Sequence, residues 1–89
     1  MLHRIYISIT LDDTDDVCLY LDADIPARLC VNEAVSIDQF GWVKFVETTI
    51  YSLFFKRYET ELKVDESANE EGRTITKNAL VNEGWTLLP

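Results

Sequence analysis

Residues 37–63 carry the feature that most limits how this chain can fold, an apolar series at helical spacing. Large apolar side chains recur there at intervals of mostly three or four residues, at Val43, Val46, Ile50, Leu53 and Phe54. Such intervals place side chains on one stripe of an α-helix, which has 3.6 residues per turn. The spacing predicts a long amphipathic helix over 37–63, with this stripe packed against a sheet.

Both ends of the stretch favour the helix. The sequence Ser36-Ile37-Asp38-Gln39 matches a capping box, in which the serine hydroxyl accepts from a backbone N–H of the first turn. Glu59 and Lys63 form a favourable acid-to-base pair four residues apart. The alternative divides the stretch into strands, because residues 48–51 have strand propensity and Gly41 is unfavourable inside a helix. We prefer the helix, since one strand cannot keep this spacing over about twenty positions.

The N-terminal segment has the period of a strand. Ile5, Ile7, Ile9 and Leu11 alternate with Arg4, Tyr6, Ser8 and Thr10. Such alternation indicates one buried and one solvated face. Residues 12–16 are turn formers, and the alternation resumes at Val17, Leu19 and Leu21. The pattern predicts an antiparallel hairpin.

The rest of the chain offers shorter elements. Residues 27–32 fit an edge strand and a loop equally well. Thr76 can cap a short helix through Val81 that ends at Gly84 and precedes a strand over 85–88, and a hairpin over 74–88 is the alternative. We prefer the helix and strand. The predicted fold class is therefore α+β, a small antiparallel sheet of the N-terminal hairpin and a C-terminal strand, packed on one long amphipathic helix.

The length of 89 residues allows one hydrophobic core. We therefore expect a single small domain over residues 1–89. Its hydrophobic content of 47% is enough to offset the entropy of ordering the chain. Residues 64–73 are polar and acidic, so they are predicted to form an exposed acidic loop or linker.

Charge restricts the class of partner. Sixteen acids against eight bases give a formal net charge of −8. The acids gather in two clusters, one of Asp12, Asp13, Asp15, Asp16, Asp22 and Asp24, and one of Glu59, Glu61, Asp65, Glu66, Glu70 and Glu71. Such fields repel phosphate groups, so direct binding to nucleic acid or to an anionic membrane is not expected. A protein partner with a basic surface fits the charge.

Catalytic and metal-binding patterns are not found in the sequence. His3 is the sole histidine and is expected to be solvated, so no nucleophile has a base beside it. Cys18 and Cys30 are expected to be small buried apolar residues in a reducing compartment, with a disulfide as the alternative. The aspartates of 12–16 lack the glycine and distal glutamate of a calcium loop. We expect no enzyme activity, no metal and no cofactor.

A second apolar series on the predicted helix would need a cover besides the sheet. It consists of Tyr51, Phe55, Tyr58 and Leu62, at the same helical spacing. Soluble monomers avoid leaving such a patch open. The cover is the C-terminal segment, a second copy of the chain in a homodimer, or another protein.

The functional hypothesis is a non-enzymatic, cytoplasmic interaction domain, a regulator or inhibitor that occupies a basic surface of a protein partner. A nucleic-acid mimic is one form of it, with the size and charge of small acidic inhibitors from phages and mobile elements. The alternative is a structural module that self-associates through its long helix. The candidate contact residues are Asp12, Asp13, Asp15, Asp16, Asp22, Asp24, Glu59, Glu61, Tyr51, Phe55, Tyr58 and Leu62.

Overall fold

Most of the described part of the chain is β-structure. The computed structural model describes residues 1–11, 15–37, 39, 43–63 and 77–88. The described elements are β1 (Leu2–Leu11), β2 (Asp15–Asp24), β3 (Ala34–Ser36), β4 (Val43–Ser52), β5 (Arg57–Leu62), α1 (Lys77–Asn82) and β6 (Thr86–Leu87). The strands form a mixed sheet in the order β3-β4-β5-β1-β2-β6.

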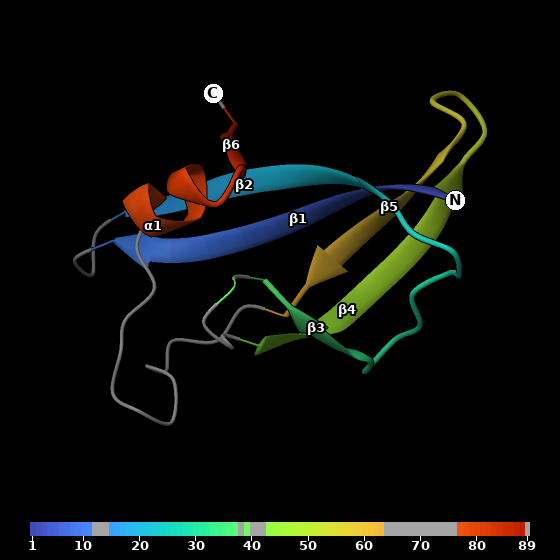
Figure 1. The fold of residues 1–89 in the computed structure, drawn as a ribbon, viewed down its shortest axis with the longest axis horizontal. Helices are drawn as coiled ribbons and strands as arrows, with labels where there is room; N and C mark the ends of the chain where they lie inside the picture. The colour runs from blue at the N-terminus through green and yellow to red at the C-terminus, as the bar shows by residue number, and fades with distance from the viewer. Residues whose placement is uncertain (12–14, 38, 40–42, 64–76, 89) are drawn as a thin grey trace.

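Two antiparallel hairpins make up most of this sheet. In the first, β1 pairs with β2 from Leu2↔Asp24 to Leu11↔Asp15, which confirms the predicted N-terminal hairpin. In the second, β4 pairs with β5. Parallel pairing of β1 with β5 joins the two hairpins, which cross at an angle in the twisted sheet (Figure 1). A purely antiparallel sheet was expected, and this junction makes the sheet mixed.

The predicted α+β fold with a long helix over 37–63 is wrong. Residues 43–62 are instead two strands joined by a turn, and the one helix in the described part of the chain is the short α1. Ser36, the expected helix cap, is the last residue of β3. Residues 27–32 are not a strand, because the edge strand β3 begins only at Ala34.

Two irregularities give the second hairpin the spacing of a helix. The register shifts between Val46 and Thr48, as at a β-bulge, so Val46 and Thr49 face the same side although they are three residues apart. Four turn residues then separate the strands, which makes Tyr51 pair with Tyr58. Partners seven residues apart in sequence mimic about two turns of a helix.

The core lies on one face of the sheet. Its buried apolar side chains are Ile5, Ile7, Ile9, Leu19, Leu29, Ile37, Val46, Leu62, Leu80 and Trp85. Four of them, from Leu29, Ile37, Leu80 and Trp85, come from segments outside the strands and cover this face. The opposite face carries Arg4, Tyr6, Ser8, Cys18 and Tyr20, none of which is buried. We call this second face the open face.

The C-terminal segment closes the core. It forms the predicted short helix and then a terminal strand. Gly84 follows α1 with φ of 105°, a conformation that a side chain would strain. The Trp85 indole Nε1 donates to the Ile37 carbonyl oxygen at 3.1 Å. Strand β6 then pairs with β2 at Leu19↔Leu87 and Tyr20↔Thr86.

His3 belongs to the buried face, so the expectation of a solvated side chain is wrong. Its ring is fully buried and stacks on Tyr58, with ring centroids 4.9 Å apart. The Leu29 backbone N–H donates to Nε2 at 3.4 Å, and Nδ1 lies 3.1 Å from the Met1 carbonyl oxygen. Both ring nitrogens therefore have a backbone hydrogen-bond partner. His3 is a packing residue that holds the segment around Leu29.

Both cysteines are free thiols. Cys18 is half-buried on the open face, and Cys30 is exposed. The expectation that both are buried is therefore wrong, since neither is fully buried, and the alternative of a disulfide between them is not realised.

Candidate interaction surface

The turn of the second hairpin presents a large exposed apolar surface. Its residues Leu53, Phe54 and Phe55 are 87%, 85% and 55% exposed. We call these three residues with Lys56 the hairpin tip. The tip projects beyond the rest of the sheet, at the end of the molecule away from α1 (Figure 1).

The hairpin tip is ordered by local contacts. The Lys56 N–H donates to the Ser52 carbonyl oxygen at 2.8 Å, and the Phe55 N–H donates to Ser52 Oγ at 3.1 Å. The Phe54 and Phe55 rings meet edge to face at 4.8 Å, and the Arg57 guanidinium lies 4.5 Å from the Phe55 ring centroid. A turn fixed in this way loses little entropy when a partner binds it.

The apolar surface of the hairpin tip is comparable to the largest patch on many soluble monomers, which is often functional. A buried aromatic side chain covers about 150–250 Å². At their exposed fractions, Phe54 and Phe55 together offer on the order of 250 Å² to solvent. Ile50 and Tyr51, just before the turn, are 63% and 48% exposed and point to opposite faces of β4. Contiguous apolar patches of several hundred Å² mark interaction sites on soluble proteins.

Sequence reasoning missed two of the tip residues, because Leu53 and Phe54 were assigned to the core stripe of the helix. They are the two most exposed large apolar side chains in the described part of the chain. A usable signal is present in the sequence, where an apolar run without alternation, Leu53-Phe54-Phe55, stands between two strand-like segments. The run lacks Gly, Pro, Asn and Asp, the residues that usually reveal a turn.

Ion pairs neutralise two of the predicted acidic contact residues on the open face. Arg4 Nε donates to Asp22 Oδ1 at 2.7 Å, and Arg4 Nη2 donates to Oδ2 at 2.9 Å. The hydrogen bond from Arg4 lowers the pKa of Asp22 and in turn raises the pKa of Arg4. The guanidinium also lies 4.1 Å from the Tyr20 ring centroid. The Asp22 carboxylate is therefore already paired with Arg4.

The Glu59 carboxylate also has hydrogen-bond partners within the chain. It accepts a hydrogen bond from the Tyr6 hydroxyl at 2.7 Å and one from Arg57 Nε at 3.1 Å. Burial raises the pKa of Tyr6, and the hydrogen bond to Glu59 raises it further. Because Arg57 also lies against Phe55, this network ties the base of the hairpin tip to strand β1.

The lowered pKa of Asp22 gives the protein an acid sensitivity. A carboxyl group whose pKa is lower in the folded state stabilises the fold above its unfolded pKa, near 3.9, and loses this contribution as the pH falls through the folded value. The Asp22 side chain is 44% exposed, so screening limits the effect to less than about 1 kcal/mol. Denaturant melts of Asp22→Asn should show a flatter dependence of stability on pH below 4 than the wild type. An unchanged slope would contradict the assignment.

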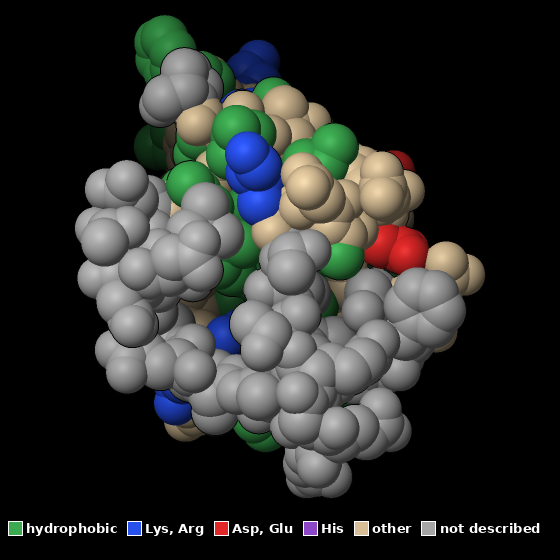
Figure 2. Space-filling view, turned by 90° about the vertical axis from the view of Figure 1, so that its left-hand side faces the viewer, with side chains coloured by type: hydrophobic (Ala, Val, Ile, Leu, Met, Phe, Trp, Pro, Cys, Tyr) green, Lys and Arg blue, Asp and Glu red, His purple; other side chains and the backbone are tan. Residues whose placement is uncertain are grey.

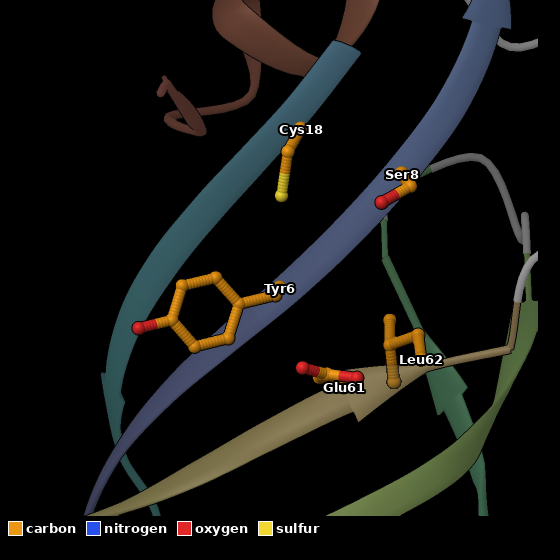
Figure 3. Close-up of a pocket in the computed structure, with 5 residues that line it drawn as sticks. All are labelled: Tyr6, Ser8, Cys18, Glu61 and Leu62. Atoms are coloured by element: carbon orange, nitrogen blue, oxygen red, sulfur yellow. The ribbon is translucent and has the colours of Figure 1, made fainter. Parts of the chain in front are cut away.

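A hollow on the open face lies beside the network. It has a volume of about 190 Å³ and is lined by Tyr6, Ser8, Cys18, Glu61 and Leu62 (Figure 3). The first four come from three neighbouring strands, since Tyr6 pairs with Glu61 and Ser8 pairs with Cys18. It brings together one carboxylate, two hydroxyl groups and a thiol.

The structure separates the remaining acidic candidates. Asp24 is exposed and pairs with the N-terminal amine at 2.8 Å, and this hydrogen bond lowers the pKa of Asp24. Asp12 and Asp13 lie outside the described residues, as do residues 64–73. Asp15 and Asp16 begin β2, and their side chains are also outside the described part.

The second apolar series is not a continuous stripe in the structure. Tyr51 is exposed on β4 and packs edge to face on Tyr58 at 5.0 Å. Tyr58 is half-buried against His3, Phe55 lies in the hairpin tip, and Leu62 is buried in the core. With the helix absent, the four side chains fall on different parts of the molecule.

Charged side chains are mixed with apolar ones on part of the surface. On the face drawn in Figure 2, described Lys and Arg side chains lie among apolar ones, and described Asp and Glu side chains lie toward the right-hand edge.

No group of three or more His, Cys, Asp or Glu within the described residues could hold a metal ion. Among the same residues, no helix is long and apolar enough to span a membrane.

Comparisons with known proteins add no relative. No protein-family model matches the sequence, and neither the curated proteins nor the solved structures contain a match.

Proposed function

We propose that this chain is a non-enzymatic interaction domain that inserts its hairpin tip into an apolar cleft of a protein partner. The observation that carries the proposal is the exposure of Leu53, Phe54 and Phe55 on an ordered turn. Aromatic anchors that fill a pocket supply most of the binding energy in many interfaces. By occupying such a cleft, the domain acts as a regulator or inhibitor of its partner.

The net charge supports a partner with a basic surface around the cleft. A charge of −8 speeds encounter with a positive surface and disfavours acidic partners. The tip itself carries the cation Lys56, so we assign attraction to the net negative charge of the chain and anchoring to the apolar side chains. The free thiols of Cys18 and Cys30 are compatible with a cytoplasmic location.

A second copy of the chain is a poorer binding partner for the tip than a different protein. Two tips meeting each other would bury roughly 400 Å² per copy, about half of the roughly 800 Å² per partner in a stable interface. A concave cleft on a different protein surrounds the tip and adds contacts from its rim. The self-association alternative was based on a long helix, which the described chain does not contain.

The proposal is tested by capturing partners with the wild type and with Phe54→Ser, followed by quantitative mass spectrometry. Val81→Ser is the matched control, because Val81 is also exposed and apolar but lies on α1. We expect a specific protein to be lost with Phe54→Ser and retained with Val81→Ser, and the purified pair to bind at least tenfold more weakly with the tip variant. Stability should stay within about 0.5 kcal/mol in both variants.

Three outcomes would contradict the proposal. The first is capture that is unaffected by Phe54→Ser. The second is a concentration-dependent dimer in light scattering that this variant abolishes, which would assign the tip to self-association. The third is sedimentation with neutral phosphatidylcholine vesicles that the variant abolishes, which would assign the tip to a lipid surface.

A further inference from the structure

The hollow on the open face lies where strands β1 and β5 stop pairing. Their parallel ladder runs from His3↔Tyr58 to Tyr6↔Glu61, and Ser8 lies beyond its last pair. The Ser8 hydroxyl, the Cys18 sulfur and the Glu61 carboxylate point toward the same space beside the Tyr6 ring (Figure 3). Backbone topology therefore gathers polar atoms from three strands around one hollow.

Glu61 differs from the other described carboxylates on this face. Asp22 is paired with Arg4, and Glu59 is paired with Arg57 and Tyr6. Within the part of the chain that the structure describes, Glu61 has no ion pair and no side-chain hydrogen bond, and it is exposed. It is a carboxylate that can accept an incoming cation without breaking an existing pair.

The size and lining of the hollow indicate what kind of cation it takes. Its volume of about 190 Å³ is below the roughly 300–1,000 Å³ of pockets for drug-sized ligands, so it suits one side chain. The Tyr6 ring offers an apolar face for an aliphatic stem and for a cation. Ser8 Oγ and the Glu61 carboxylate supply acceptors.

We propose that this hollow receives a lysine or arginine side chain of the protein partner. The inference rests on the proposed function and names the second contact of the same interface. Glu61 lies four residues along β5 from Arg57 at the base of the tip, about 13 Å at the rise of a strand. A standard interface of about 800 Å² per partner is roughly 30 Å across, so one partner can cover both.

The hollow is tested by NMR titration of the whole protein with N-acetyl-lysine-N-methylamide and its arginine analogue. N-acetyl-norleucine-N-methylamide is the neutral control, at constant ionic strength. We expect saturable shift changes at Tyr6, Ser8, Cys18 and Glu61 with the two cationic probes only. Glu61→Gln should weaken this binding at least tenfold, whereas Glu47→Gln, at an exposed carboxylate on β4, should leave it unchanged.

Each other outcome overturns the inference. Equal shifts with norleucine would make the hollow merely apolar, and the same shifts with magnesium chloride would make it a site for a small cation. Shift changes that persist in Glu61→Gln, or that are equally large at Asp22 and Asp24, would contradict the assignment of the hollow as the binding site. Should Glu61→Gln fail to reproduce the wild-type spectrum, Ser8→Ala replaces it, with a measurable weakening expected and unchanged binding contradicting the site.

The tip variant separates this inference from the proposed function. Phe54→Ser should abolish capture of the partner and leave the lysine titration unchanged, because Phe54 does not line the hollow. If partner capture is insensitive to Phe54→Ser while the titration succeeds, the proposed function fails and the hollow remains a cation site. If Phe54→Ser abolishes partner capture but the lysine titration gives no saturable shift changes, only the inference about the hollow is wrong.

Discussion

Val46→Asp is expected to abolish cooperative unfolding, leaving a chain without a thermal transition. Val46 is fully buried in the core, on strand β4. An aspartate there would replace an apolar core side chain with a buried carboxylate, at a cost of several kcal/mol. That cost is comparable to the whole stability of a small domain, about 5 kcal/mol at the low end. Circular dichroism melts measure the result.

Phe45→Asp is the matched control for this prediction. Phe45 precedes Val46 directly but is 50% exposed, because successive side chains of a strand point to opposite faces. The variant should melt cooperatively, with a loss of no more than about 1 kcal/mol. A wild-type melt of Val46→Asp would contradict the placement of β4, and so would equal damage from both variants.

Trp85→Ala is expected to cost about 3–5 kcal/mol, the usual range for a buried aromatic side chain. Trp85 is 4% exposed in the core, and its Nε1 hydrogen bond to the Ile37 carbonyl oxygen links the C-terminal segment to the connection before β4. Removing the indole leaves a cavity and an unpaired carbonyl group. At about 4–8 °C per kcal/mol for a domain of this size, Tm should fall by at least about 12 °C.

Trp85→Phe separates the two parts of this effect. Phenylalanine keeps most of the apolar bulk and removes only the hydrogen bond, so the loss should be on the order of 1–2 kcal/mol. Chemical denaturation with both variants measures the difference. A cost for Trp85→Ala no greater than that for Trp85→Phe would mean that the segment from 85 onward does not close the core.

The alternation of polar and apolar residues was the sequence pattern that predicted structure correctly. It predicted the first hairpin, and the faces it assigned to Ile5, Ile7 and Leu19 are the buried ones. The same alternation extended by two residues would have placed His3 on the buried face. His3 was instead judged by its nearness to the terminus and its chemistry, although an imidazole with two hydrogen-bond partners is readily buried.

Spacing alone could not identify the second hairpin. The bulge after Val46 moves Thr49 to the core side, where its hydroxyl lies 3.1 Å from that of Thr60. Only the pairing partner reveals such a shift, and that partner follows later in the sequence. The strand propensity of residues 48–51 was the correct local signal, and the helical interpretation outweighed it.

The candidate contact residues illustrate the same limit. Composition could point to Asp22, Glu59 and Glu61 as acidic side chains, but it could not tell which of them already has a partner. Arg4 lies 18 residues from Asp22 in the sequence, and Tyr6 lies 53 residues from Glu59. Pairing across strands decides which carboxylates stay free, and only the sheet topology sets that pairing.

The parallel junction of β1 with β5 also sets how the chain reaches its fold. Each hairpin joins neighbouring segments, so each can form early at a small cost in loop closure. When the two hairpins join, residues as distant in sequence as Tyr6 and Glu59 must come together. Such long-range contacts slow folding. Until that union, one edge of β1 has no β5 beside it and can pair with another chain. Refolding yield should therefore fall as protein concentration rises, even where the native state is stable.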